Sequence, residues 1–426
     1  MPVSRTGSSI FWTGGSFLEY SSLKIFITMI VTNYWNSAWR SLTKKKGFSA
    51  INIVGLAIGM AAALLILTYV AFEYSYDDMH SRQDRIFRVE ARFYENGELT
   101  DDWASSSAGY ATAMKQNMSA VEDYTRVGSQ YFPEQVVKYN ELLYRETGIG
   151  YAEANFFDFF DFKLLKGNKE SCLDGPNKVV ITERIARKYF KGADPIGKIL
   201  IFRSNIGEEA CEVTGIMEDM PVNTHIRYNL LISYKTLPKW MDEYWYRHEV
   251  YSYVLLKSAN LKTQVEEDFP AMAEKYKTEE ALKNKTWAIQ LTNLRDIHLN
   301  PQKAYEPEVK GNRSSIWVLI CTALAILCIA WINYINMTVA RSMERAKEIG
   351  IRRASGASRR QVVSQFLFES LVTNSIAFIL AVGLMEALMP AFNNLTGRDL
   401  SFSVWFTTSL GWYLLLIFAA GGFLSG

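Results

Sequence analysis

Residues 192–198 come closest to a motif with its own chemistry, because Gly192, Gly197 and Lys198 have the spacing of a phosphate-binding loop. In such a loop the backbone N–H groups hold the phosphates, and a Ser or Thr after the lysine holds magnesium. Here Ile199 follows the lysine, Pro195 removes one backbone donor, and the glycines come after an expected helix instead of a strand. We therefore expect a turn between a helix and a strand that does not bind ATP.

The histidines and cysteines give little further chemistry. The chain has four histidines without metal-ligand spacing such as His-x-x-x-His, namely His80, His225, His248 and His298. A Ser/His/Asp triad stays open, because its members are neighbours in space only, but no pattern argues for one. Cys321 and Cys328 are expected to be small apolar residues on one helix, whereas Cys172 and Cys211 could pair only if folding brings them together.

Composition leaves room for two or three domains in 426 residues, and 49% of the residues are apolar. The apolar residues are gathered into long runs, so a membrane domain and a water-soluble domain are expected in one chain. A formal net charge of +2 without a clustered basic face gives no reason to expect a nucleic-acid partner.

Four apolar runs are long enough to cross the roughly 30 Å hydrocarbon core of a bilayer as helices. We expect transmembrane helices at residues 47–72, 315–340, 362–390 and 405–426. The last run reaches Gly426 without a polar flank, so we expect a truncated fourth helix.

The distribution of Lys and Arg predicts the orientation of these spans. Basic residues precede the first span and acidic residues follow it, and basic residues also dominate the loop 341–361. Residues 1–46 and 341–361 are therefore predicted to be cytoplasmic, and residues 73–314 and the short loop 391–404 to lie outside.

The N-terminal segment 1–46 has two expected parts. Residues 1–28 lack the cleavage site of a signal peptide, so we expect translation to start at Met29 and the preceding stretch to be a disordered extension. Between residues 34 and 42, Trp35, Ala38, Trp39 and Leu42 recur at helical spacing beside basic residues. This pattern is typical of an amphipathic helix that lies on the inner membrane surface.

The segment 73–314 mixes strand and helix patterns. Residues 86–93 alternate in a way that predicts a half-buried strand, and Asn96-Gly97 predicts a hairpin turn after it. Thr182 is expected to cap a helix that Gly192 ends. The aromatic run 156–160 is expected to pack in the core or between subdomains, and would be a docking patch if it were exposed. The fold class is therefore a helical membrane domain of four transmembrane helices, one plus three, with an inserted α+β extracytoplasmic domain.

The loop 341–361 predicts a basic hairpin that protrudes from the membrane. Glu344 and Glu348 precede basic residues at helical spacing, and a turn at residues 355–358 leads to Ser358 and Gln361, which form a capping-box pattern. A solvated charged face is the plainer interpretation of these charges taken alone.

Several residues inside the expected spans bear on helix contacts. A small-xxx-small stripe formed by Gly55, Gly59 and Ala63 indicates close helix packing, within this chain or with a second copy. Polar residues are costly in a bilayer unless they face protein or water, and here they are Asn333, Asn336 and Glu369. For Glu369, pairing with a nearby Arg or Asn competes with a role in gating.

Taken in order, these residues resemble the FtsX-like ABC transporter permeases, and within them those with a MacB-like periplasmic core domain. The resemblance covers residues 29–426 and rests on the stretches 39–42, 52–56, 75–77, 84–89, 155–157, 163–167, 194–198, 345–357 and 365–370. The stretch 345–357 is the most specific of them.

The resemblance implies a multi-pass permease of the bacterial inner membrane with a periplasmic domain that binds substrate or an adaptor. It implies a separate cytoplasmic ABC ATPase subunit that recognises the loop 341–361, so this chain is not expected to be an enzyme or to hold a cofactor. The residues expected to contact that ATPase are Glu344, Arg345, Lys347, Glu348, Arg352 and Arg353. Membrane lipid is a further expected partner.

Many relatives are double length, so we expect this chain to be a fragment or one half of such a permease. Its partner would then be the second half, and otherwise a second copy of the chain. Export of peptides, drugs or lipoproteins, or the transmission of movement, is the expected function. The alternatives are a membrane-anchored receptor or scaffold, and an outer-domain hydrolase.

Overall fold

The structure is a computed structural model, and two compact units can be separated in it, Met1–Ala71 with Ile316–Gly426, and Phe72–Ser315. It describes residues 32, 34–40, 42–44, 46–128, 134–204, 207–242, 245, 247–277, 284–307, 310–340 and 342–402, and then 405, 411–412, 415, 418–419 and 421. The expected start at Met29 and the extension 1–28 lie outside the described residues.

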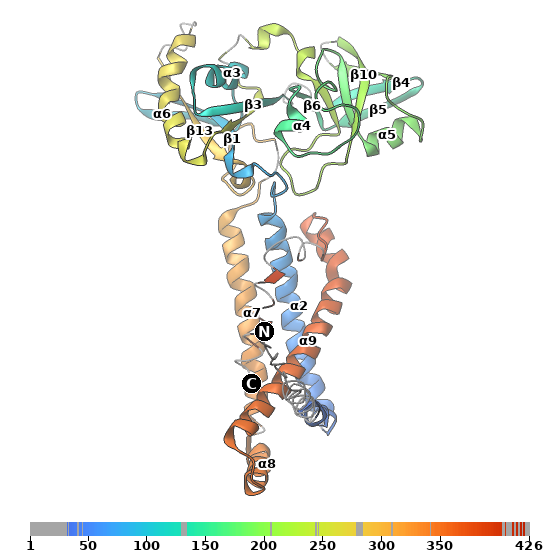
Figure 1. The fold of residues 1–426 in the computed structure, drawn as a ribbon, viewed down its shortest axis with the longest axis vertical. Coiled ribbons are helices and arrows are strands. Elements are labelled where there is room, and N and C mark those ends of the chain that lie inside the picture. The colour runs from blue at the N-terminus through green and yellow to red at the C-terminus, as the bar shows by residue number, and fades with distance from the viewer. Residues whose placement is uncertain are drawn as a thin grey trace, which may run out of the picture. The chain divides into compact units, whose positions relative to one another are not determined.

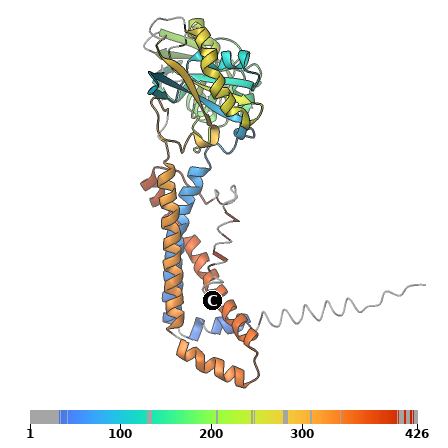
Figure 2. The same ribbon diagram turned by 90° about the vertical axis from the view of Figure 1, so that its left-hand side faces the viewer.

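The first unit is helical (Figures 1 and 2). Its helices are α2 (Lys46–Tyr74), whose last turn belongs to the other unit, α7 (Arg313–Val339), α8 (Ser342–Ala354) and α9 (Arg359–Thr396). By length and apolar composition α2, α7 and α9 are candidates to cross a membrane. The described residues between 405 and 421 are helical too, but most of the predicted fourth span lies outside the described residues and stays a prediction.

Helix α9 begins and ends where local chemistry dictates. Ser358 and Gln361 form the predicted capping box, in which each side chain bonds to the other residue's backbone N–H. At the other end Gly397 adopts a left-handed conformation with φ of 65°, which a glycine tolerates without strain. Figure 2 shows α8 turned away from the axis of α7, so α8 and the start of α9 form a hairpin.

The second unit contains one mixed sheet. Its path runs β13-β1-β12-β3-β6-β11-β8-β10-β9-β4-β5, with β2 paired to β1 and β7 to β10. The strands are β1 (Ile86–Glu95), β2 (Glu98–Trp103), β3 (Val121–Gly128), β4 (Glu134–Tyr139), β5 (Leu142–Thr147), β6 (Ile149–Ala152), β7 (Leu164–Lys166), β8 (Lys178–Thr182), β9 (Ile199–Ser204), β10 (Gly207–Met217), β11 (Leu230–Ser233), β12 (Val250–Leu256) and β13 (Thr286–Asn293). The β8–β10 and β6–β11 pairs are parallel and the other pairs antiparallel.

The sheet narrows where β3 meets β6, because only Val127 and Gly128 pair there, with Ala152 and Tyr151. Two lobes result, one around β1 and one around β10 (Figure 1). The helices of this unit are α3 (Ala108–Asn117), α4 (Phe156–Phe159), α5 (Glu183–Phe190) and α6 (Lys262–Ala273). The unit is therefore a sheet-rich domain with few and short helices.

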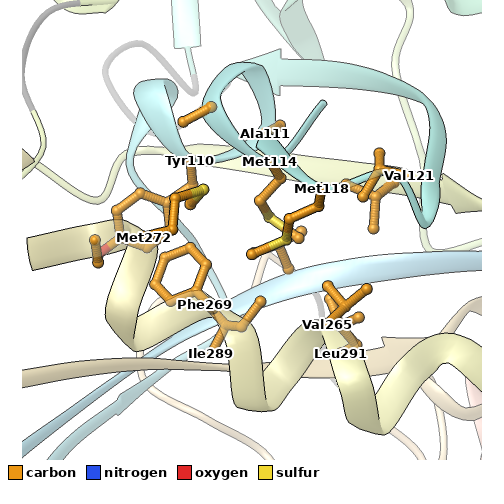
Figure 3. Packing of buried hydrophobic residues seen from close by; sticks show 14 of the residues in the cluster. Tyr110, Ala111, Met114, Met118, Val121, Val265, Phe269, Met272, Ile289 and Leu291 are labelled. Carbon is orange, nitrogen blue, oxygen red and sulfur yellow. The ribbon is translucent and has the colours of Figure 1, made fainter. Parts of the chain in front are cut away.

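Three buried clusters form the core. In the first lobe, apolar residues of α3 and α6 pack against β1 and β13, as Figure 3 shows for Met114, Phe269 and Ile289. A second cluster lies between β8, β10 and α5. The third contains the aromatic run of residues 156–160, which confirms that run as core.

Several local predictions can be compared with these elements. The hairpin at Asn96-Gly97 is confirmed between β1 and β2, and Thr182 caps α5 by accepting a hydrogen bond from the N–H of Ile185. Helix α5 ends at Phe190, and its C-cap is Lys191 in a left-handed conformation, one residue before the expected Gly192. Cys172 and Cys211 are buried free thiols, so they do not pair.

The prediction of a half-buried first strand was wrong. Strand β1 is buried on both faces over most of its length, and Arg88 and Glu90 are 0% and 1% exposed. The alternation of polar and apolar residues suggested a face in water, whereas buried partners of opposite charge neutralise these two side chains instead.

Candidate functional site

In the second unit, several buried polar side chains lie where the chain enters and leaves the unit. The incoming segment, residues 73–80, begins in the last turn of α2, and the outgoing segment, residues 295–313, leads into α7. Glu73 Oε2 lies 2.7 Å from His298 Nε2, and the two side chains are 1% and 2% exposed. Tyr76 stacks on the His298 ring with a centroid distance of 3.4 Å. The incoming and outgoing segments are thus fastened to each other.

Gly311 is part of this contact. A Cβ atom at that position would lie 2.5 Å from Glu73 Oε2 and 2.9 Å from His298 Nε2. Real Cβ atoms do not approach other atoms so closely, so the outgoing backbone can pass here only because residue 311 has no side chain.

The incoming segment also binds the loop between β10 and β11. Asp77 accepts hydrogen bonds from the Thr224 hydroxyl at 2.6 Å and from the His225 backbone N–H at 3.3 Å. Its other oxygen lies 2.7 Å from His225 Nδ1, and His225 Nε2 lies 2.9 Å from the Tyr253 hydroxyl on β12. Asp77 has a φ of 60°, a conformation that Asp tolerates better than most residues. These contacts connect the end of α2 to the centre of the sheet.

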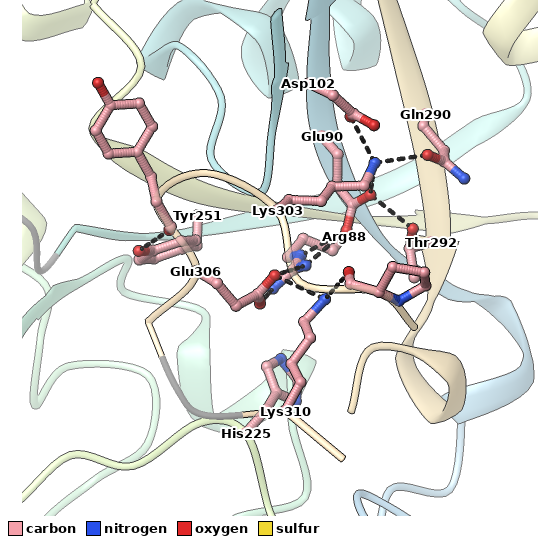
Figure 4. Close-up of polar contacts among 12 residues, drawn as sticks. Arg88, Glu90, Asp102, His225, Tyr251, Gln290, Thr292, Lys303, Glu306 and Lys310 are labelled. Carbon is pink, nitrogen blue, oxygen red and sulfur yellow. Dashed lines mark hydrogen bonds and ion pairs between the residues drawn. The ribbon is translucent and has the colours of Figure 1, made fainter. Parts of the chain in front are cut away.

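The outgoing chain crosses β1 as a strap, by which we mean residues 301–307 and 310. Lys303 Nζ contacts Glu90 at 2.8 Å, Asp102 at 2.7 Å and the Gln290 side-chain oxygen at 2.6 Å. Figure 4 shows strap side chains pointing to β1, where Lys303 meets Glu90 and Glu306 meets Arg88.

Arg88 is the centre of this network. Its guanidinium lies 2.6 Å from Glu90 and 2.6 Å from Glu306, and Glu306 in turn lies 2.7 Å from Lys310. All of these side chains are almost completely buried. Such a network holds together only while every charge has its partner, because an unpaired buried charge is strongly destabilising.

The pKa values report this balance of charges. Burial alone would lower the pKa of Arg88, but Glu90 and Glu306 raise it above its usual range. Burial would raise the pKa of Glu90, but Arg88 and Lys303 keep it below its usual range. For Lys310, burial and the charge of Arg88 lower the pKa. Burial also lowers the pKa of the nearby His80 to about 4.

The contacts of this region fit a structural role. Asp77, His225 and Tyr253 follow the order of a carboxylate–imidazole–hydroxyl triad, but all three are at most 6% exposed and the hydroxyl is a tyrosine's. Burial raises the pKa of Tyr253 well above its usual value, which makes its hydroxyl a poor nucleophile. The series therefore acts as a structural tie.

The remaining sequence motifs can be placed as well. Gly192 and Gly197 lie in turns between α5 and β9, as predicted from Pro195 and the preceding helix. Over the part of the chain that the structure describes, no group of three His, Cys, Asp or Glu is arranged to hold a metal ion.

In the membrane unit, the small-residue stripe of α2 faces α7. A Cβ at Gly59 would lie 2.7 Å from the Ala330 Cβ, and one at Gly55 would lie 3.7 Å from the Asn333 side-chain nitrogen. Ala63 is completely buried. Of the two uses that the sequence left open for this stripe, packing within the chain is the one these distances fit.

The three polar residues predicted inside the spans have different surroundings. Asn333 and Asn336 on α7 are exposed in the single chain, although Asn333 lies beside Gly55. Glu369 on α9 is partly buried. That the two asparagines face protein or water in the membrane stays a prediction.

The predicted ATPase-contacting residues lie on α8. Arg352 donates a hydrogen bond to the Gln365 side-chain oxygen at 2.7 Å, and Arg353 is exposed. Glu344, Arg345, Lys347 and Glu348 are helical, and their side chains lie outside what the structure describes. Their role stays a prediction, as do the two expected charge pairs, Glu344 with Lys347 and Glu348 with Arg352.

Sequence reasoning missed the strap and its partners on β1. Glu306 and Lys303 lie more than two hundred positions from Arg88 and Glu90 along the chain, so no local pattern connects them. The available signal was the run of large apolar residues on both sides of Arg88 and Glu90, which is typical of a strand buried on both faces.

Comparison with known proteins gives two family matches. Residues 49–272 match the MacB-like periplasmic core domain, and residues 320–426 match the FtsX-like permease C-terminal domain. The first match covers more than half of the chain and includes the incoming segment, Arg88 and Glu90.

Similar individual proteins include exporters from other bacteria. The chain is 28% identical to the macrolide export ATP-binding/permease protein MacB of Neisseria meningitidis serogroup A over 262 residues, which cover 59% of this chain and 38% of that protein. It is 23% identical to the probable syringafactin export ATP-binding/permease protein SyfD of Pseudomonas syringae pv. tomato, over 83% of this chain and 50% of that protein. The chain thus spans half or less of the length of these two relatives.

A solved structure of the periplasmic region of MacB from Actinobacillus actinomycetemcomitans is also similar. It has 15% sequence identity and a TM-score of 0.31, and the match covers 46% of this chain and 87% of that structure.

Proposed function

The chain belongs to the FtsX-like ABC transporter permeases with a MacB-like periplasmic core domain, and from this premise we propose that it couples a cytoplasmic ATPase to movement of its outer domain. In this proposal the chain lies in the bacterial inner membrane with the residues between α2 and α7 in the periplasm. The ATPase is a separate subunit that docks on the hairpin of α8 and α9.

The observation that carries this proposal is the double fastening of the outer domain. A domain linked to its spans by free loops would not follow their movement. Here Glu73 and His298 join the incoming and outgoing segments, Asp77 joins the first to the β10–β11 loop, and the strap joins the second to β1. A shift of α2 or α7 would therefore reach the sheet through buried, charge-paired contacts.

The hairpin on the opposite end of the spans supports the docking site. Helix α8 carries both signs of charge, with Arg352 and Arg353 in its last turn, and its end is held to α9 by the bond from Arg352 to Gln365. A rigid, charged projection is a suitable surface for a soluble partner, because charge complementarity guides association.

The cargo and the full assembly follow from the relatives only by analogy. Both named relatives are exporters, which favours export of peptides, drugs or lipoproteins. A working permease needs a second membrane half, and a second copy of this chain or the other half of a longer protein would supply it. An adaptor in the periplasm and lipid around α2, α7 and α9 complete the proposed set of partners.

Charge reversal in the hairpin tests this function. Cells would express the full chain with Glu348→Arg and Arg352→Glu together, and the chain would be purified from gently solubilised membranes. We expect the wild type to copurify with a nucleotide-binding subunit and the variant to lose it together with transport. The matched control is reversal of the exposed outer-domain pair, Glu134→Arg with Arg145→Glu, which should change neither.

Two results would count against the proposal in different ways. A reversed hairpin that retains its ATPase and its transport would remove α8 as the docking site. If no ATP-hydrolysing subunit copurifies with the wild-type chain, the receptor or scaffold hypothesis is favoured. In that hypothesis the outer domain only senses or docks.

A further inference from the structure

Gln365, in the second turn of α9, lies where three cytoplasmic segments of the membrane unit meet. Its side-chain oxygen accepts a hydrogen bond from Arg352 Nη1 at the end of α8, at 2.7 Å. Its side-chain nitrogen donates to the Ser37 hydroxyl, in the helical stretch of residues 34–40 before α2. Because arginine has donors only, the amide oxygen must face Arg352, and this leaves the amide nitrogen for Ser37. One partly buried amide thus bridges two segments.

The stretch 34–40 packs on α9 by one face. The Tyr34 hydroxyl lies 2.9 Å from the Ser364 hydroxyl, and the Tyr34 and Phe368 rings are 5.9 Å apart. Ala38, one turn after Tyr34, is 2% exposed, whereas Trp35 and Trp39 are 50% and 54% exposed. Positions 34, 37 and 38 share a helix face by their spacing, so the contact made through Gln365 continues a packed surface.

We propose that Gln365 is a positioning residue that joins the stretch 34–40 and the end of α8 into one platform, through which movement of the docked ATPase reaches α2. This inference rests on the function proposed above. It adds a route that does not pass through α7, because the stretch 34–40 leads into α2 after only a few residues. Helix α2 then continues to Tyr74, and its last residues, from Phe72 on, belong to the second unit.

The two hydrogen bonds of Gln365 lie at opposite ends of this route, so each can be broken separately. Arg352 lies in the segment that the ATPase is proposed to hold, and Ser37 lies in the segment that precedes the first span. Loss of the Gln365 amide should leave the docking surface of α8 in place, since no residue of α8 is changed. The same loss should prevent docking of the ATPase on α8 from affecting the stretch 34–40.

Hydrogen exchange on the full chain in lipid nanodiscs, measured without and with its ATPase subunit, tests the inference. In the wild type, addition of the ATPase with a non-hydrolysable ATP analogue should slow exchange in both α8 and the stretch 34–40. In Gln365→Ala, we expect slowing in α8 only, because the end of α8 is then no longer joined to the stretch 34–40.

A set of further variants separates positioning from simple damage to the fold. Ser37→Ala breaks only the far side of the bridge and should reproduce the loss of slowing in the stretch 34–40, and the double variant should be no worse than Gln365→Ala alone. Ser375→Ala is the control, because its exposed hydroxyl donates to the Leu371 backbone oxygen of the same helix. Normal slowing in the stretch 34–40 of Gln365→Ala would overturn the inference while the proposed function stands. Absence of slowing in α8 of the wild type would overturn both.

Discussion

Arg88 offers the sharpest test of how the outer domain is held to its outgoing chain. Its guanidinium is 0% exposed and neutralises Glu90 on its own strand and Glu306 on the strap. Arg88→Met keeps the length and most of the volume of the side chain but removes its charge. Lys303 still faces Glu90 and Lys310 still faces Glu306, so each carboxylate keeps one of its two cationic partners.

The expected cost follows from breaking a buried ion network by removing one member, which destabilises by about 3–5 kcal/mol. The two lysines that remain place Arg88→Met near the lower end of that range. Arg92→Met is the matched control on the same strand, because Arg92 is 29% exposed and its contact to Asp102 is 3.3 Å. A long, partly exposed ion pair of that kind contributes about 0–1 kcal/mol.

Urea unfolding of a fragment spanning residues 72–315, followed by circular dichroism, measures both costs on the unit that contains the network. Hydrogen exchange of the strap amides in the full chain then shows whether the strap has detached from β1. A free energy of unfolding for Arg88→Met that equals that of Arg92→Met would refute the view that buried charges hold the strap.

Three further predictions concern other parts of the chain. Burial lowers the pKa of His80 from about 6.5 in the unfolded chain to about 4 in the folded protein. The unfolded chain therefore binds this proton more readily, and the free energy of unfolding should fall by roughly 3 kcal/mol as the pH is lowered from 6.5 to 4. His80→Asn should flatten this loss in pH-dependent urea unfolding, and equal slopes would contradict it. Gly59→Val should lower the melting temperature of the solubilised chain by overpacking α2 on α7, at a cost of about 1–3 kcal/mol. Gly383→Val, whose Cβ would meet nothing within 4 Å, should not. Gly311→Ala should displace Glu73 and accelerate hydrogen exchange of the backbone amides in the last turn of α2. Unchanged exchange there would contradict the proposed fastening of the incoming and outgoing segments.

Much of the architecture could be predicted from local signals. An uncharged apolar run predicts a spanning helix because it is long enough and has no group that must stay in water. Gln361 and Thr182 end up in the predicted caps because capping depends on a few consecutive residues. Asn96-Gly97 forms its turn for the same reason, since both residues readily adopt positive φ.

The fastening of the outer domain could not be predicted in this way. Its contacts join Glu73 to His298 and Arg88 to Glu306, across more than two hundred residues. A buried arginine also has the same local sequence pattern as an arginine on a solvent-exposed strand face. The difference lies in distant carboxylates that neutralise the buried one. Gln365 was noted only within a family motif, because its bridge depends on Ser37, at the other end of the chain.

The central claim is that ATP binding inside moves the outer domain, and single-molecule energy transfer tests it most directly. Dyes would be attached to Met79→Cys in the outer domain and Ile351→Cys on α8, which are 39% and 61% exposed, after replacement of the exposed Cys321 and Cys328. With the copurified ATPase in lipid nanodiscs, ATP should shift the distance distribution between the two dyes, and Arg352→Glu should abolish the shift. Distributions that stay identical with and without ATP, while the bound ATPase hydrolyses it, would contradict the account.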